Sequence, residues 1–291
     1  MNPQDFAIPG TVRVEAGPGG LTQLVISNDL ADAAVFLQGA LVASYQPRNA
    51  DPVLWMSPKA IYQPGKAPRG GIPVCWPWFG PHSFDARQAS HGIVRTREWT
   101  PVESMCLHDG STRIVLAYQH DGSGPWPFKA EARLEVTVGR RLTVELVITN
   151  RGDEPLTYQD ALHSYLHVGD VRQCTLHGFD HAPYIDKTDS FQRKVHTGPL
   201  RLTKQTDAVF TRHHGTVEIE DPVLGRRLII TKHGSEETVV WNPWATAAAT
   251  VQDIGDGWSE MLCVEAATCC DRWIHLDPAG EHRTRQTIGI A

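Results

Sequence analysis

Apolar side chains recur at every second position through much of this chain, and this spacing limits the possible folds more than any other feature. In the segment 142–148 every second residue is apolar and would lie on one face of a strand, because successive side chains of a β-strand point to opposite faces. The segment 132–138 repeats the pattern, and the link Gly139-Arg140 between them is typical of a hairpin turn. Further strands are expected at 11–15, 22–27, 33–37, 112–119, 216–220, 226–231, 237–241 and 260–267.

Turn signals such as Pro18-Gly19-Gly20 and Asp109-Gly110 separate these segments, and no long amphipathic helix with caps is visible. A repeat of about 20–50 residues, which would indicate a propeller or a solenoid, is also not seen. The polar segment 180–212 is expected to form loops. We therefore predict an all-β fold, a large antiparallel β-sandwich in which residues 1–291 form a single domain.

Charge and composition exclude several classes of partner. The net charge is −6 and there is no basic tail, so a nucleic-acid partner is not expected. The sequence has no run of about 18 apolar residues, so no transmembrane helix is expected. It has no signal peptide, so secretion is not expected either. The six cysteines include no C-x-x-C pair and are expected to be reduced thiols. We expect a cytoplasmic monomer whose partner is a small molecule, with neither nucleic acid nor membrane.

The segment from Arg69 to Pro81, Arg-Gly-Gly-Ile-Pro-Val-Cys-Trp-Pro-Trp-Phe-Gly-Pro, could form the wall of a binding pocket. Its glycines allow a close approach of the backbone, its prolines fix an extended path, and Arg69 could bind an anion. The alternative is a proline-rich loop that packs on the core, with Arg69 in a surface salt bridge. The residues alone favour that alternative.

Two histidine motifs follow. In His91-Gly-Ile-Val-Arg95, a strand would place His91 and Arg95 on the same face, which suits a polar or anionic ligand. The residues alone favour an ordinary loop-to-strand junction with two solvated side chains. In His163-Ser-Tyr-Leu-His167, a strand would place both histidines on one face. A helical metal-binding pair would use the same spacing, but the neighbourhood does not resemble a helix. A hydrogen-bonded structural histidine is the remaining alternative.

Glu265 lies in the apolar segment Met-Leu-Cys-Val-Glu-Ala-Ala, where an ionised carboxylate without a partner is costly to bury. Burial of this kind shifts pKa values and makes Glu265 a candidate general base, unless it reaches solvent or pairs with an arginine. Asp207 could accept hydrogen bonds from sugar hydroxyls or could simply cap a turn. The segment Trp241-Asn-Pro-Trp244 could flank a sugar ring or belong to the core.

Taken in order, these motifs resemble the hexose-6-phosphate mutarotases of the aldose 1-epimerase superfamily, in particular the glucose-6-phosphate 1-epimerase branch. The resemblance rests on the Arg-Gly-Gly-Ile-Pro and Trp-Pro-Trp-Phe-Gly segments, on His91-Gly-Ile-Val-Arg95 and on the later motifs, and it covers about residues 65 to 270. It implies a galactose-mutarotase-like sandwich, with no metal and no organic cofactor. It also implies that His163 is the catalytic acid and Glu265 the base.

The same resemblance implies that His91 and Asp207 hold the sugar and that Arg69 and Arg95 bind its 6-phosphate. The chain departs from the family pattern after Trp244, where Ala-Thr-Ala-Ala-Ala stands in place of a segment that usually contains a lysine. The preferred sugar is therefore open. Alternatives are a mutarotase for unphosphorylated aldoses and a non-catalytic carbohydrate-binding or regulatory protein. A glycoside hydrolase is less favoured, because hydrolases usually pair two carboxylates.

Overall fold

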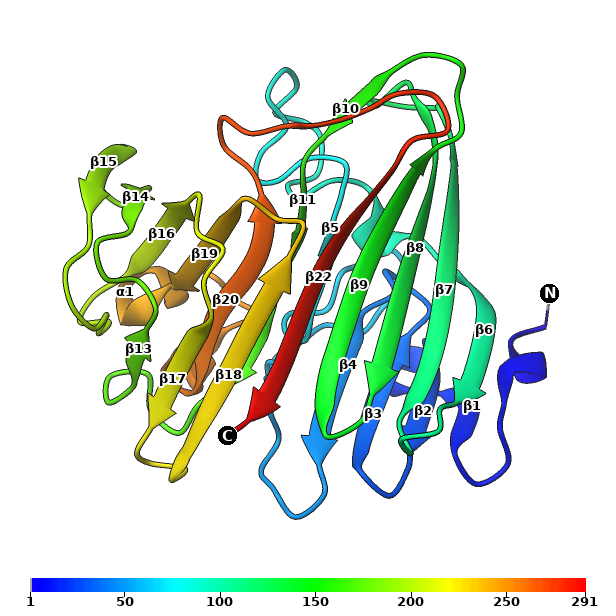
Figure 1. The fold of residues 1–291 in the computed structure, drawn as a ribbon, viewed down its shortest axis with the longest axis horizontal. Helices are drawn as coiled ribbons and strands as arrows, with labels where there is room; N and C mark the ends of the chain where they lie inside the picture. Colours follow the sequence, from blue (N-terminus) through cyan, green and yellow to red (C-terminus); the bar gives the residue numbers. More distant parts are fainter. Residues whose placement is uncertain (1) are drawn as a thin grey trace.

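A computed structural model describes residues 2–291 and shows two large antiparallel sheets packed face to face (Figure 1). The hairpin predicted from the alternating pattern is present, and Gly139-Arg140 links its two ten-residue strands. They belong to a sheet of eight strands. In spatial order these are β13 (Thr175–His177), β17 (Val217–Asp221), β18 (Arg226–His233), β22 (Glu281–Ile290), β9 (Arg141–Asn150), β8 (Lys129–Val138), β7 (Thr112–Asp121) and β6 (Thr100–Cys106).

The second large sheet carries the residues discussed below. Its strands, in spatial order, are β15 (Gln192–Val195), β14 (Pro183–Asp186), β16 (Thr206–Thr211), β19 (Glu237–Asn242), β20 (Met261–Thr268), β11 (Asp160–Leu162) and β5 (Val74–Cys75), and β12 (Tyr165–His167) also pairs with β20.

Smaller elements complete the fold. A four-stranded sheet near the N-terminus contains β1 (Val12–Ala16), β2 (Thr22–Ser27), β3 (Ala31–Phe36) and β4 (Val42–Pro47), and β10 (Leu156–Tyr158) pairs with β21 (Ile274–Leu276). The helical elements are short: α1 (Trp244–Ala248) and the 3-10 turns η1 (Pro3–Phe6), η2 (Pro18–Gly20), η3 (Val94–Thr96) and η4 (Gly255–Glu260). No helix among residues 2–291 is long and apolar enough to cross a membrane.

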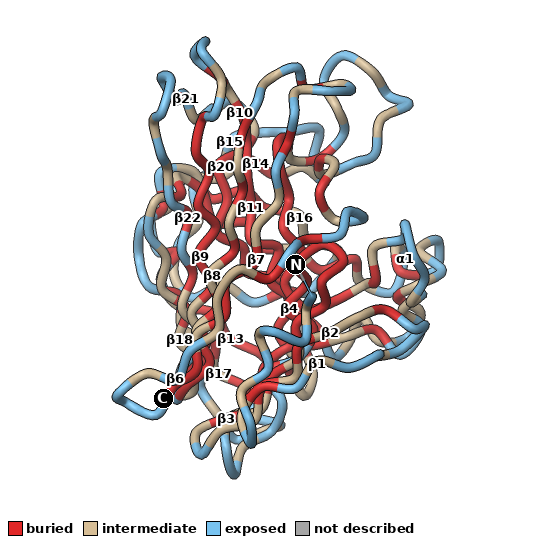
Figure 2. Tube along the Cα trace, turned by 90° about the vertical axis from the view of Figure 1, so that its right-hand side faces the viewer, coloured by how far each residue is buried: buried red, intermediate tan, exposed pale blue. Residues whose placement is uncertain are grey.

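Burial follows the alternation that the sequence shows. In β8 and β9 the side chains of Leu134, Val136, Leu146 and Ile148 are all fully buried, and they belong to one apolar cluster that extends from Val12 to Ile288. In Figure 2 the buried residues, drawn in red, lie mainly along the strands in the middle of the molecule, and the exposed ones lie mainly in the outer loops. Burying a Val, Leu or Ile side chain contributes roughly 1.5–3 kcal/mol, so this cluster is the main source of stability.

One local expectation was wrong. The segment 180–212 is not only loops, because it contains β14, β15 and β16, and Asp207 lies in β16 rather than in a turn. These strands are short and their burial does not alternate, so they lack a clear period-two pattern. The segment from His91 to Arg95 is a turn that leads into η3, which agrees with the loop and not with the strand alternative, and His91 and Gly92 both adopt positive φ angles.

Candidate active site

Strand β20 supplies the floor of the site. All eight of its residues are buried, and Cys263 and Glu265 point to the same face. Cross-strand pairing places Trp241 of β19 and Tyr165 of β12 on either side of Cys263, and Asp207 of β16 beside Trp241. Residues directly opposite one another share a face of the sheet. Four strands that are distant in the sequence therefore present one row of polar and aromatic side chains next to Glu265.

A break between β11 and β12 positions His163. The N–H of His163 donates to the carbonyl of Pro73 at 3.0 Å, so this residue leaves the pairing with β20. The hydroxyl of the next residue, Ser164, is hydrogen-bonded to Gln286, whose amide donates to the carbonyl of Val264 at 2.8 Å. These buried bonds tie the break to both large sheets. They fix the backbone on which the His163 side chain is carried.

His163 and Glu265 meet at the base of the site. The Nδ1 atom of His163 lies 3.4 Å from Oε1 of Glu265, and the two residues are 8% and 1% exposed. Burial raises the pKa of Glu265 well above its usual range, and the charge of Asp207 adds to the rise while Lys187 opposes it. Burial also lowers the pKa of His163 well below its usual range, with further lowering by the charges of Arg95 and Arg69. Without a ligand, desolvation therefore favours an uncharged pair, in which Glu265 is protonated and the imidazole of His163 is neutral.

The other oxygen of Glu265, Oε2, has no hydrogen-bond partner among residues 2–291, and the same holds for Nδ1 of His163. Buried polar atoms are rarely left without partners, and such atoms call for an explanation. These two atoms, Oε2 of Glu265 and Nδ1 of His163, are therefore free to form hydrogen bonds with a hydroxylated substrate.

His91 forms a wall of the site beside this pair. Its ring lies 5.5 Å from that of His163, and its Nδ1 accepts a hydrogen bond from the N–H of Gly80 at 3.3 Å. Burial lowers the pKa of His91 to about 3, with a contribution from Arg95, Lys187 and Arg69. The imidazole is therefore neutral, and because Nδ1 accepts, Nε2 carries the hydrogen and can donate to a ligand.

Gly92 allows this wall to form. A Cβ atom at Gly92 would lie 1.9 Å from the carbonyl oxygen of Trp76, and its φ angle is +81°. The N–H of Ile93 donates to the same carbonyl at 3.0 Å. The glycine thus lets the two pocket motifs approach each other.

Three cationic side chains surround the histidines. Arg69 donates to the hydroxyl of Tyr165 at 3.1 Å and pairs with Asp253 at 3.2 Å. The ring of Tyr165 is stacked on that of His163, with centroids 4.8 Å apart. Arg69 therefore lies beside the histidines and is also in a partly exposed salt bridge, the alternative that the sequence had left open.

Lys187 and Arg95 are the other two cations. Lys187 pairs with Asp207 at 2.9 Å and lies over the ring of Phe79. Arg95 donates to the carbonyl of Ser90, next to His91, and its charge acts on both His91 and His163.

The structure therefore brings together the five residues His163, Glu265, His91, Arg69 and Arg95, which the sequence had marked as candidates. It connects Asp207 to them through Lys187. His167, by contrast, lies near the carbonyl of Pro52, with its Nδ1 3.3 Å away.

Sequence reasoning missed Lys187 and Asp253. Both are single charged residues in polar segments, where no local pattern marks them. Cys263 stands two positions before Glu265, so strand parity could have placed it on the same face.

Ligand atoms of His163, Cys263 and Glu265 all lie within 4.8 Å of one another, a spacing that a metal ion could span. Burial, however, raises the pKa of the Cys263 thiol well above its usual range. Metals bind the thiolate, so Cys263 would have to lose this proton to serve as a ligand.

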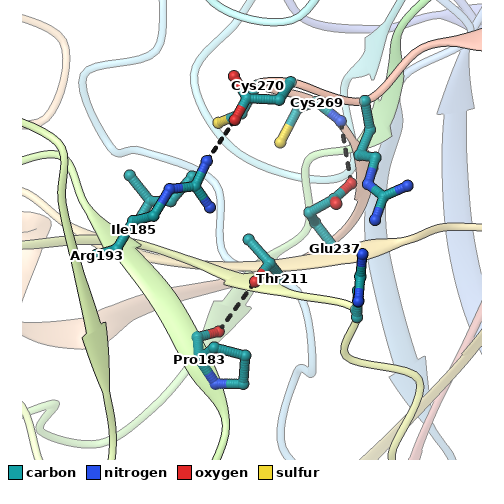
Figure 3. Close-up of a pocket in the computed structure, with 10 residues that line it drawn as sticks. Pro183, Ile185, Arg193, Thr211, Glu237, Cys269 and Cys270 are labelled. Carbon is teal, nitrogen blue, oxygen red and sulfur yellow. Dashed lines mark hydrogen bonds and ion pairs between the residues drawn. The ribbon is translucent and has the colours of Figure 1, made fainter.

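A separate hollow lies further along the same sheet, where Glu237 pairs with Ala267 two residues beyond Glu265 (Figure 3). Its volume is about 470 Å³, and Arg193, Thr211, Cys269 and Cys270 are among its lining residues. Burial raises the pKa of Glu237 to about 7, although the N–H of Cys269 donates to its carboxylate. The catalytic candidates do not line this hollow, so it is a neighbour of the site.

Comparison with known proteins agrees with this geometry. A profile of the family described as aldose 1-epimerase matches residues 22–289, and the chain belongs to that family.

A protein of Cenchrus ciliaris, provisionally named a glucose-6-phosphate 1-epimerase, is 31% identical over 281 residues, which cover 92% of this chain and 84% of the relative. A protein of Escherichia coli K12 with the same provisional name is 30% identical over 253 residues, covering 85% and 83% of the two chains.

Among solved structures, a Salmonella typhimurium protein described provisionally as a mutarotase superposes with a TM-score of 0.90 at 26% identity, covering 98% of this chain and 95% of the other. The resemblance and the all-β sandwich predicted from the sequence are thus confirmed. The chain is an isomerase of the epimerase type that acts on a sugar.

Proposed function

We propose that this enzyme interconverts the α and β anomers of a hexose 6-phosphate, with glucose 6-phosphate as the first candidate. The observation that carries the proposal is the buried pair His163 and Glu265, placed 3.4 Å apart beside the guanidinium groups of Arg69 and Arg95. The provisional names of the curated relatives support the same substrate. A charged substrate of this kind also supports a cytoplasmic location, which we propose with it, together with a monomeric state.

In the proposed reaction Glu265 accepts the proton of the anomeric hydroxyl while His163 donates a proton to the ring oxygen. The C1–O5 bond breaks, its electron pair goes to the ring oxygen, and C1 becomes the carbonyl carbon of an open-chain aldehyde. Rotation about C1–C2 presents the other face of the carbonyl. The two groups then act in reverse, and the ring closes as the other anomer with no net change in protons.

The remaining residues hold the sugar in place. Arg69 and Arg95 provide the planar, bidentate donors that suit a phosphate group. In this proposal the Nε2–H of neutral His91 and the carboxylate of Asp207, which pairs with Lys187, bind sugar hydroxyls. The ring of Trp241, 6.1 Å from that of His163, can pack against the apolar face of a pyranose.

The test is anomer exchange of glucose 6-phosphate, followed by magnetisation-exchange NMR with and without the protein. Glu265→Gln and His163→Ala should each reduce exchange by about 10²–10⁴-fold, the usual contribution of a positioned acid or base. His167→Ala is a matched control, since this histidine belongs to the same motif but contacts Pro52. Exchange at the wild-type rate in either site variant, with the fold retained, would contradict the mechanism.

A mutarotase for unphosphorylated aldoses is the second candidate, because Arg69 already has a carboxylate partner in Asp253 and could be structural. This candidate predicts that Arg69→Ala and Arg95→Ala leave kcat/KM for the preferred sugar unchanged. Our proposal predicts a large loss for glucose 6-phosphate with both variants. A protein that binds the sugar phosphate but leaves exchange at its spontaneous rate would instead be a binding protein.

A further inference from the structure

The charges around His163 do not balance in the unliganded site. Three cations surround it, and two of them have carboxylate partners: Arg69 pairs with Asp253, and Lys187 pairs with Asp207. Within the described part of the chain Arg95 has no such partner, since its hydrogen bond goes to the carbonyl of Ser90.

His163 is well placed to sense this excess positive charge. Arg69 reaches it through Tyr165, whose hydroxyl accepts the guanidinium hydrogen bond and whose ring is stacked 4.8 Å from the imidazole. Arg95 lies next to His91, whose ring is 5.5 Å from that of His163, and its guanidinium donates to the carbonyl of Ser90. The positive charges of Arg95 and Arg69 both disfavour a proton on His163.

The groups that face His163 from the packed elements offer little compensation. They are the neutral rings of His91, Tyr165 and Trp241 and the carboxyl group of Glu265. Nδ1 of His163 also has no hydrogen-bond partner in the range 2–291 that could stabilise a proton there. An imidazolium is therefore disfavoured in the empty site, although the acid must hold a proton before ring opening.

We propose that the phosphate group of the substrate activates the catalytic acid as well as anchoring the sugar, because its negative charge neutralises Arg95 and Arg69 and so permits His163 to carry the proton. This inference rests on the proposed function. Its consequence is that the phosphate accelerates the chemical step and does more than tighten binding. Energy from binding a remote group is then used in the transition state.

One test supplies the phosphate charge separately from the sugar. D-xylose has the glucose ring without C6, so phosphite dianion can occupy the phosphate position beside it. With wild-type protein, phosphite should increase xylose exchange by at least about tenfold, the factor that corresponds to one pKa unit at the acid. The rate at the same phosphite concentration without protein is subtracted. Inhibition by phosphite, or no effect at saturation, would overturn the inference.

A second test removes the positive charge. Arg95→Gln, which keeps a donor for the carbonyl of Ser90, should lower exchange of glucose 6-phosphate but raise exchange of xylose without phosphite. Arg95→Met, which removes charge and donor, should act in the same direction. If Arg95 only anchored the phosphate, replacing it could not increase the exchange rate of a sugar that has no phosphate group. Arg97→Gln, a nearby exposed arginine, is the matched control.

The outcomes separate this inference from the function on which it rests. If wild-type protein does not accelerate exchange of glucose 6-phosphate, the proposed function is wrong. If it does, but phosphite fails to activate xylose exchange or neither Arg95 variant increases it, the phosphate is only an anchor and the inference is wrong.

Discussion

Asn242 fixes the loop that carries Asp253 to the sheet. This fully buried residue lies at the end of β19. Its amide donates to the carbonyls of Trp258 and Met261, each at 2.8 Å, and its carbonyl accepts from the N–H of Trp244 at 2.8 Å. The three bonds hold both ends of the loop 244–260. Asp253, the partner of Arg69, lies within it.

Asn242→Ala would remove all three bonds and leave buried backbone groups unpaired. At about 0.5–1.5 kcal/mol for each bond, we expect the free energy of unfolding to fall by about 3 kcal/mol. Unfolding entropy is about 2.1 cal/mol/K per residue, so over 291 residues this loss lowers Tm by about 5 °C. Arg69 would also lose a fixed partner, so KM for glucose 6-phosphate should rise.

Differential scanning calorimetry gives the Tm, and guanidinium unfolding gives the free energy. Gln46→Ala is the matched control, because it removes one exposed amide bond, from Gln46 to the carbonyl of Ala50. This control should change the free energy of unfolding by less than about 0.5 kcal/mol. A Tm for Asn242→Ala within about 1 °C of the wild type would show that other contacts, such as that between Trp244 and Trp258, hold the loop.

Two further predictions concern stability. Burial raises the pKa of Asp160 to about 7, so the folded state holds this proton more tightly than the unfolded state and stability falls as pH rises from about 4 to 7. Asp160→Asn keeps an acceptor for Thr284 and should cancel up to about 3 kcal/mol of the loss in unfolding free energy that the wild type shows between pH 5 and 8. Chemical denaturation at each pH measures this difference, and parallel pH profiles of the two proteins would refute the prediction. Gly92→Ala should destabilise the protein by about 2–6 kcal/mol, from positive-φ strain and the clash with Trp76, and should displace His91. Gly10→Ala has the same type of φ but open space around it, so an equal Tm loss in both variants would show that the clash contributes nothing.

The alternating pattern was sufficient to predict the fold class and most long strands. The hairpin of β8 and β9 is an example, because each strand carries a full buried face. It failed where long-range pairing determines the structure. Strand β14, Pro183–Asp186, is only four residues long and its burial does not alternate, and its neighbours β15 and β16 make it a strand.

The site shows the same division. Glu265 was marked by its apolar surroundings, which are a local property of the sequence. Lys187 and Asp253 were not marked, because a single charge in a polar segment resembles a solvated surface residue. Their roles arise from Asp207 and Arg69, partners brought to them only by the folded sheet.

The position of β22 has a consequence for how the protein is made. This strand, Glu281–Ile290, lies between β18 and β9 in the interior of an eight-stranded sheet (Figure 1). Until a ribosome has synthesised the chain through residue 290, β9 and β18 expose unpaired edges, and exposed edges promote aggregation. Gln286, which braces the backbone beside His163, arrives with the same strand. A chain that stops short of it should therefore depend on chaperones and be unable to bind sugar.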